Sequence, residues 1–295
     1  EYFSELGYCV TISTRKKKYA YPGDTRVKVK FVDWQSTNSI NKLCYGIDFV
    51  FHLSSPNSSE IKQNNFLVES SSTTTQNLMK SLLKNDVKKI IYFSSAHVYS
   101  SNLNGIIKES SLLKNNHPYA INHINNERII QSYCKSNSLQ SIILRVSNAF
   151  GHPIDHKANC WSLFANDICK QAVTTGKIIL KSDGQQFRDF ITINNLCRAA
   201  HHTLSIHDNE NLLFNIGGKN SLNLISFLRS FTKRFYKRYN FNPEIILSKN
   251  LSITKNNLLE YKIDKIENTG FKLIKCFNQE IDALIVFCEN FFINE

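Results

Sequence analysis

The sequence lacks the features that define several large classes of protein. No apolar run approaches the roughly 18 to 20 residues needed to span a bilayer, and residues 1–6 are neither basic nor continuously apolar as a signal peptide would be. The eight cysteines include no C-x-x-C pair and no Cys/His cluster at zinc spacing, which predicts reduced, mostly buried thiols and no metal site. These absences favour a soluble, cytoplasmic globular protein without membrane contact.

A glycine-rich phosphate-binding turn is also absent, since no G-x-x-G-x-x-G occurs anywhere in the chain. In a doubly wound sheet this turn follows the first strand and holds a pyrophosphate at a helix N-terminus. Residues 1–6 are typical of the end of a helix, and Gly7 stands where a left-handed residue would end it. We therefore expect the sequence to begin inside the fold, after the first strand and its glycine turn, with an ordinary frayed terminus as the alternative.

Charge of one sign is in excess, with a formal net charge of +12. Positive charge attracts nucleic acids, acidic membranes and phosphorylated substrates. Lysine, however, is spread along the whole chain beside abundant asparagine, which favours a compositional bias over a binding face. We therefore expect no nucleic-acid partner, whose binding would be strongly salt-dependent.

The first half of the chain alternates short β-branched or aromatic runs with longer helical stretches, a rhythm typical of a parallel sheet built from βα units. Leu78, Met79, Leu82 and Leu83 recur at helical spacing between two nearly continuous apolar runs, which are typical of strands covered on both faces. The predicted strands are residues 8–14, 27–32, 47–53, 89–95 and 141–147. The fold class is therefore α/β, with a doubly wound parallel sheet whose first strand is missing.

The strand and helix rhythm becomes irregular after about residue 150, where Gly151, Pro153 and the pair Gly217 and Gly218 punctuate shorter elements. This change predicts a nucleotide-binding-type domain over residues 1–150 and a smaller lobe over 151–295. We expect some of the chain to cross back to the first domain.

Ser95 and Tyr119 are the residues whose pattern carries the clearest chemistry. Ser95 ends an apolar strand within SSAHVY, and open α/β sheets place ligands at such strand ends. Oxidation or reduction at a carbinol needs one group that moves the hydroxyl proton and another that fixes the oxygen. A tyrosine beside a serine meets both needs if the tyrosine pKa of about 10 is lowered by a nearby cation.

Longer motifs surround these two residues and occur in a fixed order. They are DFVFHLSS at 48–55, FSSAHVY at 93–99, PY at 118–119, LRVSNAFG at 144–151, DGQQFRDF at 183–190, FNIGG at 214–218, and YKIDK at 261–265 with GF at 270–271. Together they resemble the successive signatures of the NAD-dependent epimerase/dehydratase family, the extended short-chain dehydrogenases that modify nucleotide sugars. The resemblance covers nearly the whole chain after residue 7.

The resemblance implies roles at the substrate. Ser95 would hydrogen-bond the reacting sugar oxygen, and Tyr119 would be the catalytic acid/base. Asn148 is similar to the family's substrate-contacting asparagine. Arg188 is similar to the arginine that grips the nucleotide diphosphate, since its planar fork matches phosphate oxygens two at a time; a surface ion pair is the alternative.

The resemblance also implies roles at a bound NAD or NADP. Asp33 would contact adenine, with a turn carboxylate as the alternative, and Leu53, Ser54 and Ser55 would line the ribose and pyrophosphate. Arg15 follows the first predicted strand where an acidic residue would hold a ribose 2′-hydroxyl, so either an NADP phosphate contact or a solvated basic loop fits it.

The sequence departs from the family pattern at the catalytic helix. The family's Y-x-x-x-K is Tyr119-Ala120-Ile121-Asn122-His123 here, so His123 replaces the lysine that binds the nicotinamide ribose and lowers the tyrosine pKa. Histidine is mostly neutral at pH 7 and supplies less positive field. His123 is thus either a weakened catalytic and cofactor-binding residue or a polar residue of an inactive relative.

Two further departures concern neighbouring positions. Ser71 replaces the asparagine usual before the TTQNL stretch, and Ala96 and His97 replace the acidic pair that family dehydratases carry after the catalytic hydroxyl. Sugar dehydration is therefore disfavoured.

These observations predict an NAD(P)-dependent nucleotide-sugar epimerase or 4-ketoreductase whose substrate is destined for surface polysaccharide. The rival hypothesis is a non-catalytic relative that binds nucleotide sugar or cofactor. Family members commonly pair through two long helices per subunit, so a homodimer is one arrangement open to the chain. Asn159, Trp161 and Phe164 of the second lobe do not identify the sugar or the base.

Overall fold

The computed structural model describes residues 1–295 except 65, 136, 207–211, 248–257 and 294–295. The chain forms two compact units. Unit 1 comprises Glu1–Ser101, Glu109–Val146 and Ala200–Asn215, whereas unit 2 comprises Asn102–Lys108, Ser147–Ala199 and Ile216–Glu295. Each half of the sequence thus contributes a short segment to the unit built mainly from the other half.

A four-stranded sheet forms the centre of unit 1, in the order β10-β6-β4-β3. Strands β3, β4 and β6 are mutually parallel, with Ile91 of β4 opposite both Phe51 of β3 and Ile142 of β6. The predicted α/β class with parallel strands is therefore confirmed. The strand bounds are β3 (Phe49–His52), β4 (Lys89–Ser95), β6 (Gln140–Val146) and β10 (Leu212–Ile216).

Two more parallel strands of unit 1, β1 (Thr11–Thr14) and β2 (Lys28–Phe31), form a separate two-stranded sheet. Among the described strands, none forms backbone hydrogen bonds with both β1 and β3, so the two sheets are separate. All five predicted strands are present, and their bounds differ from the predicted ones by three residues or fewer. The short helix α1 (Tyr2–Glu5) precedes β1, and Gly7 after it has φ 87°, the left-handed conformation expected of it.

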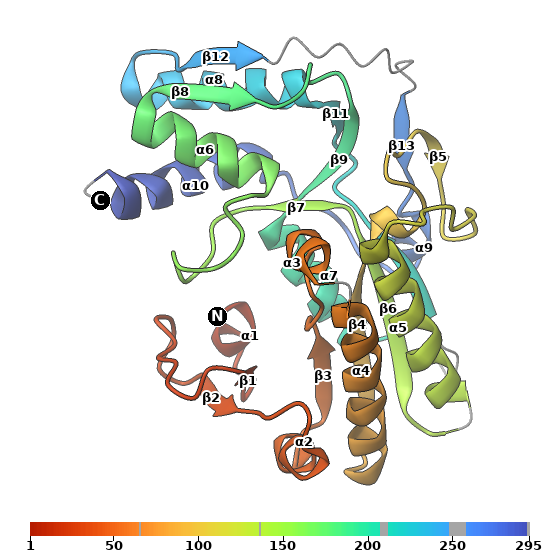
Figure 1. Cartoon of the computed structure of the whole chain (residues 1–295). Helices are drawn as coiled ribbons and strands as arrows, with labels where there is room; N and C mark the ends of the chain where they lie inside the picture. Colours follow the sequence, from red (N-terminus) through yellow and green to blue (C-terminus); the bar gives the residue numbers. More distant parts are fainter. Residues whose placement is uncertain (65, 136, 207–211, 248–257, 294–295) are drawn as a thin grey trace. The chain divides into compact units, whose positions relative to one another are not determined.

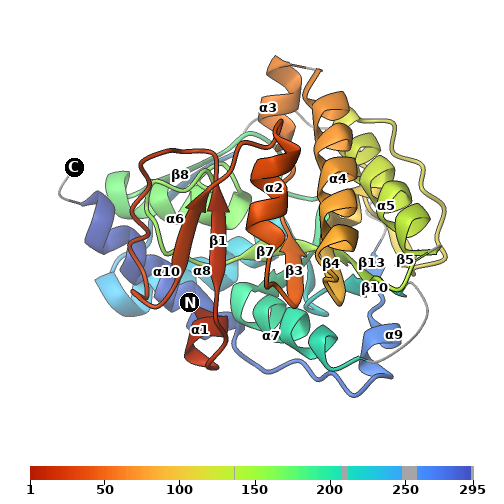
Figure 2. The same cartoon turned by 90° about the horizontal axis from the view of Figure 1, so that it is seen from below.

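Helices α2, α4 and α5 lie in a row on one face of the four-stranded sheet of unit 1, as Figure 2 shows. The apolar residues predicted to share a helix face, among them Leu78, Met79 and Leu82, are buried on α4 in one cluster with Ile90 and Tyr92 of β4. Burial of this face holds the helix against the sheet. The helices are α2 (Thr37–Cys44), α3 (Ser58–Gln63), α4 (Phe66–Lys84) and α5 (Pro118–Lys135), with the 3₁₀ turn η1 (Ala96–Val98) after β4.

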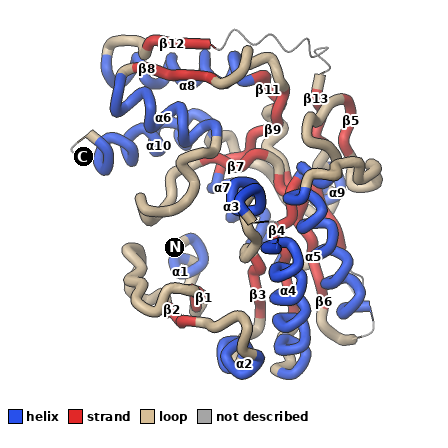
Figure 3. Tube along the Cα trace, in the orientation of Figure 1, coloured by secondary structure: helices blue, strands red, loops and turns tan. Residues whose placement is uncertain are grey.

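Unit 2 combines small sheets with helices (Figures 1 and 3). Many of its buried side chains are aromatic. Phe150, Phe190 and Phe227 contact one another, with ring centroids 4.5 to 6.4 Å apart. The strands are β5 (Gly105–Ile107), β7 (Asn148–Phe150), β8 (Lys177–Leu180), β9 (Phe187–Thr192), β11 (Ser221–Asn223), β12 (Glu244–Leu247) and β13 (Leu259–Tyr261). The helices are α6 (Phe164–Thr175), α7 (Ile193–Leu204), α8 (Leu224–Tyr239), α9 (Asp264–Glu267) and α10 (Phe277–Phe292), of which α7 ends in unit 1.

The cysteines and the hydrophobicity of the helices can be compared with expectation. Four of the eight cysteines are buried, three are partly buried, and Cys9 is exposed, so burial of the thiols is less complete than predicted. Within the described ranges, no helix combines the length and hydrophobicity needed to cross a bilayer.

Candidate active site

Ser95 occupies the end of β4, where the strand gives way to η1. Its Oγ accepts a hydrogen bond from the backbone N–H of His97 at 3.2 Å, which caps the turn. The side chain is only 8% exposed. Because the oxygen already accepts this bond, the hydroxyl hydrogen remains for another partner.

Tyr119, the second residue of α5, lies close enough to Ser95 for the serine hydroxyl to lower the pKa of the tyrosine. The structure therefore brings together the two groups that the sequence pattern paired. Burial raises the pKa of Tyr119 above its usual 10, and the Ser95 hydroxyl opposes this rise only in part. At neutral pH Tyr119 is therefore a protonated phenol beside the Ser95 hydroxyl.

His123 lies one helical turn after Tyr119, and their ring centroids are 4.7 Å apart. Its Nδ1 is 2.8 Å from the hydroxyl of Tyr92, whereas its buried Nε2 has no hydrogen-bond partner among the described residues. Burial, with smaller contributions from His52 and His97, lowers the pKa of His123 to about 4. His123 is therefore neutral, and it supplies no cation to Tyr119.

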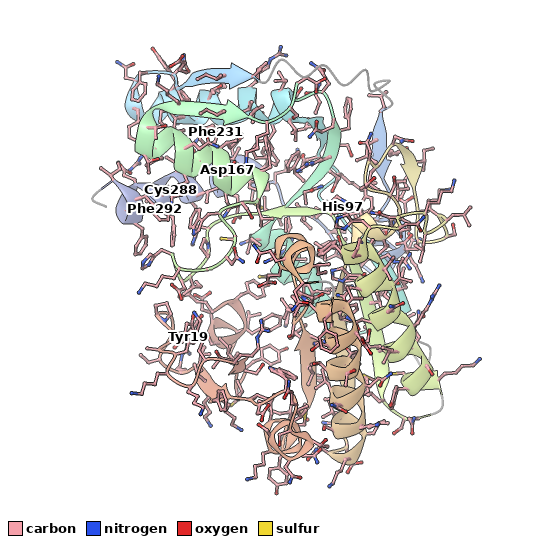
Figure 4. All side chains as sticks on the ribbon, in the orientation of Figure 1. Tyr19, His97, Asp167, Phe231, Cys288 and Phe292 are labelled. Carbon is pink, nitrogen blue, oxygen red and sulfur yellow. The ribbon has the colours of Figure 1, made fainter. Side chains whose placement is uncertain are left out.

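His97 is the other ring beside Tyr119, at a centroid distance of 6.4 Å. Figure 4 labels it near the N-terminal end of α5. The backbone oxygen of His97 accepts a bond of 2.6 Å from Asn115, which fixes the turn after β4. A histidine and an alanine thus occupy the positions of the dehydratases' acidic pair.

The residues predicted to bind a cofactor follow the C-terminal ends of the parallel strands. Arg15 and Asp33 are exposed after β1 and β2, which end together because Thr14 is opposite Phe31. The Asp33 carboxylate accepts a bond of 3.0 Å from the backbone N–H of Gln35, so the turn contact considered for it is present.

The segment after β3 carries the other predicted cofactor residues. Leu53 and Ser54 are exposed, with Leu53 at 63%, and Ser55 is partly buried. Ser55 accepts a bond of 2.7 Å from Asn122, so it joins the loop after β3 to α5.

The two predicted substrate residues, Asn148 and Arg188, belong to unit 2. They lie on neighbouring strands of one sheet, β7 and β9, and Asn148 Nδ2 donates to the Asp189 carbonyl oxygen at 3.0 Å. Arg188 is half-buried, forms no ion pair with any described residue, and has its pKa lowered by burial. The surface ion pair considered as an alternative for Arg188 is therefore absent from the described part of the chain.

Asp189 is the structural centre of the FNIGG and RDF motifs in unit 2. Its carboxylate accepts bonds from the Ser147 hydroxyl at 2.7 Å and from the backbone N–H groups of Gly218 and Asn220 at 2.8 and 3.0 Å. A Cβ at Gly218 would lie 2.0 Å from the Phe190 carbonyl oxygen, so only glycine permits this approach.

Sequence reasoning missed an ion pair inside unit 1. Arg145 donates to both carboxylate oxygens of Glu127, at 3.0 and 2.7 Å, and both side chains are almost fully buried. Ser94 also donates to Glu127 at 2.5 Å, and Arg145 lies over the Tyr99 ring. The only available signal was spacing, since Glu127 continues the i, i+4 series of Tyr119 and His123.

A cavity of about 550 Å³ lies within unit 2, beside the start of α10 and the segment that precedes this helix. Its lining includes Thr192, Asn195, Arg234 and Cys276, and none of the predicted site residues. This cavity therefore does not mark the catalytic site.

A family model matches most of the chain, and curated proteins and solved structures show partial similarity to it. The sequence model of the NAD dependent epimerase/dehydratase family matches residues 1–217. The dTDP-D-glucose 4,6-dehydratase of Dictyostelium discoideum is 27% identical over 166 residues, which cover 52% of this chain and 37% of that protein. The 3beta-hydroxysteroid-dehydrogenase/decarboxylase isoform 2 of Arabidopsis thaliana is 26% identical over 178 residues, or 59% of this chain and 30% of that protein.

The chain spans less than half the length of these two curated relatives. Among solved structures, MoeE5 in complex with UDP-glucose and NAD has a similar fold, with a TM-score of 0.81 at 19% identity. The similarity covers 98% of this chain and 93% of MoeE5, so it extends over both units.

Proposed function

The chain belongs to the NAD dependent epimerase/dehydratase family, and from this premise we propose that it transfers hydride at a carbon of a nucleotide sugar, with Tyr119 as the acid/base. The observation that carries the proposal is the proximity of the Ser95 hydroxyl to the Tyr119 phenol at the C-terminal end of β4. Ligands of open α/β sheets bind at this edge of the sheet. Ser95 orients the reacting oxygen, and Tyr119 exchanges a proton with it.

NAD or NADP is the cofactor that this proposal requires, and several residues fit one. The buried Nε2 of His123 lacks a partner among the described residues and suits a ribose hydroxyl, while Ser55, Leu53 and Ser54 follow β3 where the ribose and pyrophosphate would lie. When bound, the cofactor supplies or accepts the hydride. Arg15 and Asp33 remain proposed contacts of the adenosine half.

The protonation state of Tyr119 favours reduction over oxidation. A phenol with a pKa above 10 is almost entirely protonated at pH 7, and a protonated phenol can donate to a keto oxygen. Accepting a proton from a sugar hydroxyl requires the phenolate, which a nearby cation would stabilise, and neutral His123 offers none. We therefore favour 4-keto reduction, with epimerisation as the alternative outcome.

Support for a nucleotide-sugar substrate comes from Arg188 and from the related proteins. Arg188 is a half-buried cation with no described carboxylate partner, which suits a diphosphate. Asn148 is proposed to contact the sugar. The names of MoeE5's ligands and of the Dictyostelium dehydratase both concern nucleotide-activated sugars, whereas the Arabidopsis relative's name concerns a steroid.

The test is to incubate the purified chain with reduced NAD or NADP and a nucleotide 4-keto sugar, and in parallel with UDP-glucose. Stoichiometric consumption of the reduced cofactor with formation of a sugar alcohol is the expected result. Interconversion of UDP-glucose and its epimer without net cofactor change would replace the reductase by an epimerase. Turnover of a hydroxysteroid but of no nucleotide sugar would refute the substrate class.

A binding protein without catalysis is the second candidate, and neutral His123 favours it. His123→Lys separates the two functions, because a lysine would place a cation beside Tyr119 and lower its pKa. A gain in turnover would identify a weakened enzyme. Unchanged, absent turnover together with retained cofactor or nucleotide-sugar binding would identify a binding protein.

A further inference from the structure

A chain of buried hydrogen bonds runs behind His123. Asn122 Nδ2 donates to Ser55 Oγ at 2.7 Å, and Asn126 Nδ2 donates to the hydroxyl oxygen of Tyr92 at 3.4 Å. The Tyr92 hydroxyl is in turn 2.8 Å from His123 Nδ1. Asn122, Asn126 and Tyr92 are fully buried, so these bonds compete with no water.

The direction of these bonds follows from counting hydrogens. The Tyr92 hydroxyl has one hydrogen, and its two partners are Asn126 Nδ2, which can only donate, and His123 Nδ1. Tyr92 accepts from Asn126, and its own hydrogen goes to His123 Nδ1, the acceptor among these two partners. An Nδ1 that accepts carries no hydrogen, so the hydrogen of the neutral ring lies on Nε2.

The Nε2 atom is the one polar atom of His123 that nothing in the described part of the chain satisfies. A buried N–H without an acceptor costs about 1 to 3 kcal/mol, and native proteins retain few such atoms. His123 is 4% exposed and lies against Tyr119, so this N–H belongs to the candidate active site.

We propose that Tyr92, held by Asn126, is a positioning residue that fixes His123 as the Nε2–H tautomer, so that His123 presents a neutral hydrogen-bond donor to a ribose hydroxyl of the cofactor. The ligand in this inference rests on the proposed function, whereas the tautomer does not. His123 would then retain the hydrogen-bonding part of the family lysine's role and lose its charge.

Without the Tyr92 hydroxyl, either nitrogen of His123 could carry the hydrogen, and the Nδ1–H form would offer no donor at Nε2. Burial raises the pKa of Tyr92 well above its usual range, so the tyrosine keeps its hydroxyl hydrogen over the pH range in which most proteins remain folded.

The test uses the full chain labelled with ¹⁵N-histidine, because two-bond ¹H–¹⁵N correlation spectra report which ring nitrogen carries the hydrogen. The His123 signals are identified by their loss in His123→Gln. The wild type is expected to show Nε2–H, and Tyr92→Phe should change the tautomer ratio by about tenfold toward Nδ1–H, as the loss of one buried hydrogen bond allows. Nδ1–H in the wild type would overturn the inference, whether or not the variant folds.

Tyr99→Phe is the matched control, since it removes another buried tyrosine hydroxyl of unit 1, which donates to Asn215. It should leave the His123 tautomer unchanged; an equal shift in both variants would overturn the specific role of Tyr92.

Addition of NAD or NADP separates the two parts of the inference. A shift of the Nε2 and Nε2–H signals in the wild type, weakened in Tyr92→Phe, would support donation to the cofactor. If neither cofactor moves these signals in a protein that has the expected tautomer, the ligand assignment and the cofactor of the proposed function are overturned, while the tautomer assignment stands.

Discussion

Two stretches of α5 differ in whether their buried polar side chains have hydrogen-bond partners. In the middle of α5, Glu127 forms two bonds with Arg145 of β6, and Ser94 and Tyr99 complete the surroundings of this pair. Near its start, His123 keeps a buried nitrogen without a partner. Both stretches are buried, so exposure to solvent does not explain the difference.

The comparison separates a group that stabilises the fold from a group that is left for a ligand. Arg145 is a buried cation, but Glu127 neutralises its charge, so it cannot replace the missing lysine for Tyr119. Beside Tyr119, His123 is neutral and its buried Nε2 has no partner among the described residues. Substitutions in the two stretches should therefore affect different properties.

The largest effect is expected at Tyr119. Tyr119→Phe removes the proton donor and should lower kcat by about 10² to 10⁴-fold, while the free energy of unfolding changes by about 1 kcal/mol, the usual value of one hydrogen bond. Steady-state kinetics and urea unfolding measure the two. Tyr133→Phe, on the same helix, is the control and should leave kcat unchanged; a Tyr119→Phe enzyme with wild-type kcat would refute the assignment.

Glu127→Gln should have the opposite signature. It leaves Arg145 buried without its counter-charge, which typically costs 3 to 5 kcal/mol in the free energy of unfolding. The matched control is Asp48→Asn in the exposed Lys88–Asp48 pair, which should cost less than about 1 kcal/mol. Equal losses in the two variants would contradict the distinction between the stretches.

Acid should destabilise unit 1 through its buried histidines. His52 and His123 have pKa values lowered to about 4 by burial, whereas the unfolded chain binds these protons near 6.5. Their contribution is complete above pH 6.5 and is lost as the pH falls toward 4, by up to about 3 kcal/mol per histidine. Urea unfolding between pH 7 and 4 should therefore show a smaller loss in His52→Gln/His123→Gln, and an unchanged slope would contradict these pKa shifts.

Unit 2 also contains one arginine with a carboxylate partner and one without a described partner. The smallest effect is expected from substituting the arginine without one. Arg188→Gln should raise KM for the nucleotide sugar by about tenfold or more with little change in kcat, since hydrogen bonds to charged groups contribute about 1.5 to 3 kcal/mol. Arg234→Gln, whose guanidinium pairs with Asp282, is the control. If both variants raise KM equally, Arg188 has no special role.

The sequence predicts the strands of unit 1 well because buried parallel strands are continuous apolar runs with clear ends. It also predicts the pairing of Ser95 with Tyr119, since a strand end and a family resemblance both point to it. The bonds of Tyr92 with His123 and of Glu127 with Arg145 are missed, because they join residues that are 31 and 18 positions apart, respectively. No local pattern specifies such a pair. For the same reason the transfer of 102–108 to unit 2 and of 200–215 to unit 1 could not be located in the sequence.

The most direct test of the central claim is to follow the hydride itself. The chain is incubated with a nucleotide 4-keto sugar and NADH or NADPH deuterated at C4 of the nicotinamide, and the sugar product is analysed by mass spectrometry. The account predicts deuterium at the reduced sugar carbon, with a much lower yield in Tyr119→Phe. An unlabelled or unreduced sugar in the presence of demonstrably bound cofactor and sugar would contradict it.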